Sequence, residues 1–208
     1  MAEEKISFDL YHPHPLMIVI SGPTAVGKDA VIKLMFERKF PIHFVVTATN
    51  RPRRPAEIEG VDYFFVTTER FQEMIANNEL IEYSWVYNAY KGIPRNQVVE
   101  AFASGKDVIL RIDTQGAQKI RKIFPESVQI FLIPRNEEEL KERIKKRGTE
   151  DQKQIEERLA TAREELKCIG SFDYIVVNEN EALNRTIATI ESIIEAEHHR
   201  VHQRKIDL

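Results

Sequence analysis

The chain has 208 residues, of which 42% are apolar and 30% are charged, and its formal net charge is −3 at pH 7. That length suits one α/β domain with an insert or two small lobes, and the composition is that of a globular protein. The small net charge excludes a strong electrostatic attraction to nucleic acid or to an anionic membrane. The chain has no run of 18 apolar residues and no signal-like start, and the lone cysteine, Cys168, excludes an intramolecular disulfide. We therefore expect a cytoplasmic protein without a nucleic-acid or membrane partner, either a monomer or a homodimer.

Apolar runs alternate with helical periodicity along most of the chain. Residues 16–20 are an apolar run that ends at Ser21-Gly22-Pro23, which predicts a buried strand, and residues 28–38 show helical periodicity. We expect further strands at residues 44–46, 63–66, 80–83, 108–112, 128–133 and 174–177. We expect further helices at about 69–77, 116–123, 137–146, 151–169 and 181–200. This alternation predicts a parallel sheet with helices on both faces, with ligands beyond the carboxyl ends of its strands.

The segment from about 41 to 95 interrupts this alternation. Residues 47–59 are basic and rich in proline, and are too broken for a helix or a central strand. We expect the segment to form a small inserted α+β lobe. The rest of the single domain, which spans residues 1–208, then has its core at residues 16–40 and 96–208.

A phosphate-binding pattern follows the first predicted strand. The pattern G-x-x-x-x-G-K is matched by Gly22, Pro23, Thr24, Ala25, Val26, Gly27 and Lys28, which we call the phosphate loop. Backbone N–H groups of such a loop surround phosphate oxygens, and the lysine supplies positive charge to the β and γ phosphates of a nucleotide. The pattern normally continues with Ser or Thr, whose hydroxyl binds Mg²⁺. Here Asp29 and Ala30 follow, and Asp29 is a candidate ligand for Mg²⁺ itself.

Residues 47–63, the arginine loop, carry Arg51, Arg53 and Arg54 next to Pro52 and Pro55. Guanidinium groups match phosphate oxygens bidentately, so this loop predicts a second phosphate site.

With these motifs the chain resembles guanylate kinases, from about residue 17 to 194. Besides the phosphate loop, the resemblance rests on Arg51-x-x-Arg54-x-x-Glu57 with Gly60-x-Asp62-Tyr63, Asn78-Glu79-Leu80-Ile81-Glu82, Ile112-Asp113-Thr114-Gln115-Gly116, Arg147-Gly148-Thr149-Glu150, Arg158-Leu159 and Val176-Val177-Asn178.

The resemblance implies a P-loop kinase fold with a doubly wound parallel sheet, an acceptor-binding lobe at about 41–95 and a short lid at about 143–160. It implies transfer of the terminal phosphoryl group of ATP, with Mg²⁺, to GMP or dGMP. It assigns the phosphate loop, Asp29 and Asn178 to ATP, and catalysis to Lys28, Arg143, Arg147 and Arg158. It assigns the acceptor to Thr47, Arg51, Arg54, Glu57, Tyr63, Glu82, Lys91 and Asp113. Glu82 and Asp113 suit guanine, because carboxylates accept from its N1–H and 2-amino donors.

Several residues depart from the family pattern. Lys91-Gly92-Ile93 stands where a tyrosine, a glycine and a hydroxyl residue are usual, so Ile93 cannot give the base a hydroxyl contact. Arg111 stands where an acidic residue near Mg²⁺ is usual. Because Asp29 and Arg111 lie at the carboxyl ends of adjacent predicted strands, we expect their side chains to form an ion pair. The alternative is two independent substitutions in a weakened or inactive enzyme.

Two other functions stay open at this stage. One is a related kinase for a different phosphorylated acceptor, such as ribose 1,5-bisphosphate, because those kinases also carry Gly-Lys-Asp in the loop. The other is a non-catalytic guanylate-kinase-like module that binds phosphopeptides through the arginine loop. Such modules usually lose the loop lysine and the lid arginines, whereas Lys28, Arg143 and Arg147 are present here.

Overall fold

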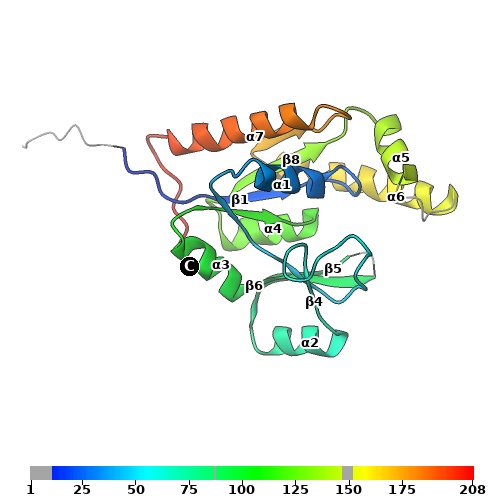
Figure 1. Ribbon diagram of the computed structural model, residues 1–208, viewed down its shortest axis with the longest axis horizontal. Coiled ribbons are helices and arrows are strands. Elements are labelled where there is room, and N and C mark those ends of the chain that lie inside the picture. The colour runs from blue at the N-terminus through cyan, green and yellow to red at the C-terminus, as the bar shows by residue number, and fades with distance from the viewer. Residues whose placement is uncertain (1–10, 87, 147–151) are drawn as a thin grey trace, which may run out of the picture.

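The protein is described by a computed structural model, which covers residues 11–86, 88–146 and 152–208 (Figure 1). A five-stranded sheet forms its centre, and every neighbouring pair of strands in it is parallel. The predicted parallel α/β fold class is therefore confirmed. The order of strands is β2 (Ile42–Phe44), β7 (Asp107–Arg111), β1 (Met17–Ser21), β8 (Val128–Ile133) and β9 (Tyr174–Val177).

Helices cover both faces of this sheet. Successive side chains of a strand point to opposite sides, and here the apolar ones on each side pack against helices. Ile18 and Ile20 of β1 pack with one set of helices, and Met17 and Val19 with the other. Figure 1 shows α1 and α7 on one side of the sheet and α3 and α4 on the other. The helices are α1 (Lys28–Glu37), α2 (Thr68–Ala76), α3 (Arg95–Ala103), α4 (Thr114–Ile123), α5 (Glu137–Lys146), α6 (Gln152–Leu166) and α7 (Leu183–His198). Within the described ranges, no helix is both long and apolar enough to cross a membrane.

A smaller, four-stranded sheet lies in the inserted segment. Its order is β4 (Phe64–Phe65), β3 (Ala48–Thr49), β6 (Ala89–Pro94) and β5 (Leu80–Val86). Helix α2 covers it through Phe71 and Met74. Strand β3 corrects the expectation that residues 47–59 could not contribute a central strand. Its two residues are buried and pair with β4 and β6 before the first proline of the loop, Pro52.

Other elements differ from the sequence expectation. Strand β2 ends at Phe44, where the predicted strand began, and β6 and α3 were not predicted at all. Helix α6 ends at Leu166 instead of continuing to residue 169. There the N–H groups of Lys167 and Cys168 bond to carbonyls three residues back, and the chain tightens into the 3₁₀ helix η1 (Ile169–Ser171).

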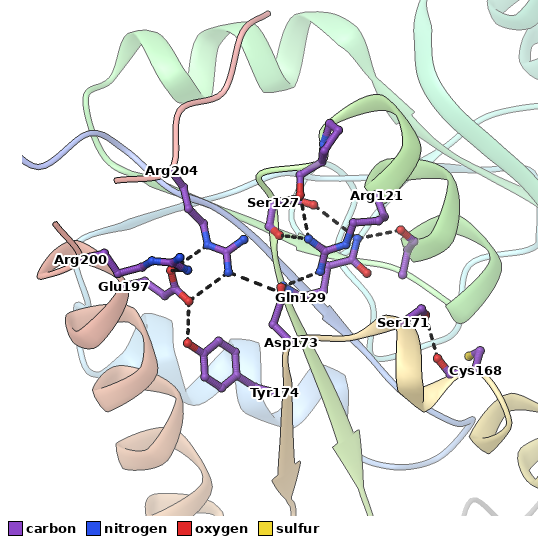
Figure 2. Close-up of polar contacts among 12 residues, drawn as sticks. Arg121, Ser127, Gln129, Cys168, Ser171, Asp173, Tyr174, Glu197, Arg200 and Arg204 are labelled. Carbon is purple, nitrogen blue, oxygen red and sulfur yellow. Dashed lines mark hydrogen bonds and ion pairs between the residues drawn. The ribbon is translucent and has the colours of Figure 1, made fainter. Parts of the chain in front are cut away.

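A polar cluster lies at the amino ends of β8 and β9 (Figure 2). The Asp173 carboxylate accepts hydrogen bonds from Arg121 (2.6 Å) and from the backbone N–H of Gln129 (2.8 Å). Nearby, the buried Glu197 accepts from Tyr174 (2.5 Å), and burial together with this carboxylate raises the pKa of Tyr174 to about 12. Because the strands are parallel, this cluster lies at the opposite end of the sheet from the phosphate loop, which follows the carboxyl end of β1.

Candidate active site

A pocket opens at the carboxyl ends of β1 and β7 and extends to the smaller sheet. Elements far apart in sequence meet there, which is where a ligand site is expected in a parallel α/β fold. Of the predicted site residues, those that line it are Thr24, Ala25, Val26, Gly27, Lys28, Asp29, Thr47, Arg51, Arg54, Tyr63, Glu82, Lys91, Asp113 and Arg158. Of the other predicted residues that the structure describes, Gly22, Pro23, Glu57, Arg143 and Asn178 lie around the pocket without lining it. Arg147 and the middle of the predicted lid fall outside the described residues.

The phosphate loop has a backbone path that its glycines make possible. Gly22 has φ of 139°, and a Cβ atom on it would lie 2.3 Å from the carbonyl oxygen of Leu132. Lys28 extends back along the loop, and its Nζ donates to the carbonyls of Gly22 (2.6 Å) and Pro23 (3.0 Å). Burial lowers the pKa of Lys28 to about 8, although the nearby carboxylates of Glu165 and Asp29 oppose the shift.

Arg143 and Asn178 bind the phosphate loop from outside the pocket lining. The carbonyl of Val26 accepts from Arg143 Nη1 and from Asn178 Nδ2, both at 2.7 Å. Arg143 also bonds to Glu139 (2.5 Å), and Asn178 Oδ1 accepts from Thr186 (3.0 Å). Both side chains thus support the phosphate loop through their hydrogen bonds to Val26. The predicted contacts of Arg143 with the transferring phosphoryl group and of Asn178 with adenine stay predictions.

Helix α6 brings an acidic residue to the loop that the sequence analysis missed. Glu165 lines the pocket, and its Oε2 accepts from the backbone N–H of Thr24 (3.2 Å). Arg158, one of the predicted catalytic residues, donates to the Thr24 hydroxyl at 3.4 Å. Positions 158 and 165 are seven apart, so they lie on one face of a helix. That spacing is the signal that could have found Glu165.

Glu57 holds the arginine loop together. Both terminal nitrogens of Arg51 bond to the Glu57 carboxylate, one of them at 2.8 Å, and the backbone N–H of Arg54 donates to it at 2.8 Å. The Arg51 guanidinium also lies over the ring of Tyr63, 5.0 Å from its centroid. Arg51, Arg54 and Tyr63, which the resemblance assigns to the acceptor, are therefore held together at the pocket.

Two buried carboxylates lie at the far end of the pocket. Burial raises the pKa of Glu82 to about 7, against the lowering effect of Lys119, whose Nζ lies 3.1 Å from Oε1. Asp113 caps α4 by accepting from the N–H groups of Gln115 (2.9 Å) and Gly116 (3.0 Å).

The second oxygen of Asp113 accepts from Ser84 (3.2 Å). Sequence reasoning missed both supporting residues, Ser84 and Lys119. Ile93, one of the departures from the family pattern, lines the pocket but is completely buried among core residues. Lys91 also lines the pocket, and its charge contributes to the lowered pKa of Lys28.

The predicted ion pair between Asp29 and Arg111 is present. Arg111 Nη1 donates to Asp29 Oδ1 at 2.8 Å, and the Arg111 side chain is only 5% exposed. Its other terminal nitrogen donates to the carbonyl of Asp62 (2.7 Å), which the sequence did not predict. The guanidinium lies over the rings of Tyr63 (4.7 Å) and Phe44 (5.2 Å).

The fold and the pocket together define a P-loop kinase. The family model for guanylate kinase matches residues 14–197. "Guanylate kinase 2, chloroplastic/mitochondrial" of Oryza sativa subsp. japonica is 48% identical over 94% of this chain and 69% of its own length. The guanylate kinase of Oceanobacillus iheyensis is 42% identical over 88% of each chain. The crystal structure of guanylate kinase from Anaplasma phagocytophilum superposes with a TM-score of 0.75 at 31% identity, covering 90% of this chain and 88% of that one. This chain belongs to the guanylate kinase family.

Proposed function

We propose that the protein transfers the terminal phosphoryl group of ATP to GMP or dGMP, giving ADP and a purine nucleoside diphosphate. The observation that carries this proposal is a single pocket lined by the phosphate-loop lysine, two clustered arginines and two buried carboxylates. These three parts match the donor phosphates, the acceptor phosphate and the guanine base in turn. Neither a sugar bisphosphate nor a phosphopeptide gives a reason for the carboxylates Glu82 and Asp113.

The reaction needs positioning and charge neutralisation more than covalent chemistry. A phosphate oxygen of GMP attacks the γ phosphorus, and the bond from that phosphorus to the bridging oxygen of ADP breaks. Lys28 and the loop N–H groups hold the β and γ phosphates, and Arg158 approaches from α6. Arg51 and Arg54 hold the acceptor phosphate, so that its oxygen faces the phosphorus. Held in this way, the two reactants need no covalent intermediate on the protein.

Guanine is read by carboxylates that are already in place. Asp113 is fixed by its bonds to the start of α4 and to Ser84, and Glu82 is held by Lys119. Both carboxylates accept hydrogen bonds, and guanine offers N1–H and 2-amino donors. Adenine has no N1–H and so cannot make the same pair of contacts. Ile93 adds no hydroxyl contact, so we expect moderate discrimination between purines.

In the proposed reaction Mg²⁺ binds together with ATP. Nucleotide-bound Mg²⁺ takes one or two carboxylates and otherwise phosphate oxygens and water. Asp29 fits this need, because its carboxylate lies beside Lys28 at the pocket and its side chain is 58% exposed. Among the described residues, no group of three or more His, Cys, Asp and Glu side chains could hold a metal alone. When bound, the metal neutralises phosphate charge.

The test is a coupled assay for ADP formation with GMP, dGMP, AMP, UMP and CMP as acceptors. We expect GMP and dGMP to give the highest kcat/KM. A preference for AMP or a pyrimidine nucleotide would show that the base-site assignment is wrong, and ADP formation with none of the five would reject the kinase. The cytoplasmic placement and the monomer or homodimer state remain expectations, which fractionation and sedimentation velocity can decide.

A further inference from the structure

Arg111 touches both phosphate-binding parts of the pocket. On one side it bonds to Asp29 (2.8 Å), which directly follows the loop lysine Lys28. On the other side it bonds to the carbonyl of Asp62 (2.7 Å) and lies over the ring of Tyr63 (4.7 Å). Arg51 lies over the same ring (5.0 Å). One buried side chain therefore connects the donor phosphate site with the acceptor phosphate site.

The arrangement is not one that stability alone explains. The Nε–H of Arg111 is buried and has no hydrogen-bond partner among the described residues, and a buried donor left unpaired is costly. An ion pair with one buried partner is also weak evidence for stability, because removing the guanidinium from water offsets the attraction. Yet the guanidinium is almost entirely buried, whereas the side chain of its partner Asp29 is 58% exposed at the pocket.

We propose that Arg111 is a positioning residue that couples binding at the donor phosphate site to binding at the acceptor phosphate site. This inference rests on the proposed function, since it takes ATP and GMP as the two ligands. The guanidinium is a rigid planar fork, so its two terminal nitrogens cannot move independently. A ligand that fixes Asp29 and the start of α1 thereby fixes Asp62 and Tyr63, and the second ligand meets a site that is already ordered. Positive coupling of the two affinities follows.

Isothermal titration measures this coupling directly. GMP is titrated into the protein with and without a saturating non-hydrolysable ATP analogue, and the ratio of the two dissociation constants is the coupling factor. The reverse titration must give the same factor, because coupling of binding is reciprocal. Couplings between sites are typically about 5- to 150-fold. We expect the unmodified protein to lie in that range, and Arg111→Ala to fall below about twofold.

Further variants distinguish the effect of the planar guanidinium of Arg111 from the effect of its positive charge. Arg111→Lys keeps a positive charge for Asp29 but replaces the rigid planar fork with one ammonium nitrogen on a flexible stem, so we expect it to lose the coupling too. It carries the test if Arg111→Ala does not fold. Asp29→Ala should lose part of the coupling, and adding it to Arg111→Ala should change the factor no further. The matched control is Arg121→Ala, which also removes an arginine bonded to a carboxylate, but at the opposite end of the sheet (Figure 2). We expect it to lower stability and to keep the coupling factor.

The outcomes distinguish the two proposals. Binding of neither GMP nor the ATP analogue by the folded protein rejects the proposed function and this inference with it. Binding of both ligands without coupling, or with coupling that survives in folded Arg111→Ala and Arg111→Lys, overturns the role of Arg111 and leaves the kinase proposal intact. Loss of coupling in Arg121→Ala as well would assign it to general destabilisation and would also overturn that role.

Discussion

Replacing Glu82 with glutamine should change stability in a way that depends on pH. Burial raises the pKa of Glu82 from an ordinary value of 4.5 to about 7 in the folded protein. The folded state therefore keeps a proton that the unfolded chain releases. The contribution of this proton to the free energy of unfolding is complete below about pH 4.5 and is lost as the pH rises through about 7. Because one pKa unit corresponds to about 1.4 kcal/mol, the loss amounts to about 3 kcal/mol.

Glutamine has nearly the same shape and does not ionise. We therefore expect Glu82→Gln to have about the parental free energy of unfolding near pH 4 and to be more stable by up to about 3 kcal/mol at pH 8.5. Urea denaturation of both proteins across this range measures the difference, and the titrating groups that do not interact with Glu82 cancel. Lys119→Met is the control, since it removes a charge that lowers the pKa of Glu82. The pH-dependent step should then move to higher pH.

The same group should link GMP binding to pH. Guanine donors need the ionised carboxylate, so the affinity of the unmodified protein for GMP should fall by about tenfold per pH unit below pH 7, beyond any change caused by the nucleotide phosphate. Glu82→Gln should bind GMP more weakly and show only the phosphate contribution. A difference in unfolding free energy that stays constant from pH 4 to pH 8.5 would refute the reasoning about burial.

Three further substitutions test the other parts of the pocket. Lys28→Met should lower kcat by about 10²–10³ because it removes a positive charge that stabilises the transferring phosphoryl group. Near-parental turnover would reject the kinase assignment. Arg51→Ala should raise the KM for GMP about 10- to 100-fold and that for ATP far less, whereas equal rises would place the arginine loop elsewhere. Gly22→Ala should destabilise the protein by more than about 1–3 kcal/mol because of its positive φ and its close approach to Leu132. Thermal denaturation showing unchanged stability would contradict that account.

Features encoded in a short stretch of sequence were predictable. The phosphate loop is one continuous motif between a strand and a helix, and the structure has it there. The Asp29–Arg111 pair was also predictable, because two adjacent parallel strands end at the same edge of a sheet. The register of β1 and β7 pairs Ile20 with Arg111. Topology thus brought two distant residues together without knowledge of any contact.

Features fixed by distant partners were not predictable. The two residues of β3 form a strand because Thr49 pairs with Lys91, and no local pattern of two residues shows that. The second partner of Arg111 is the backbone carbonyl of Asp62, a group that every residue has, so the sequence carries no signal for it. Arg143 was placed on the correct helix, but the direction of its side chain toward Val26 depends on how α5 packs.

The ion pair between Asp29 and Arg111 also constrains the order in which mutations can build such a pocket. Starting from the more usual hydroxyl residue and carboxylate, a first change at position 111 buries a guanidinium that faces no carboxylate. A first change at position 29 instead places two carboxylates side by side. On electrostatic grounds we expect both intermediates to be worse than either end state, so that the two changes show epistasis. Each substitution judged alone would be classed as damaging, although the two together leave the local charge balanced, so variants at these positions should be interpreted as a pair.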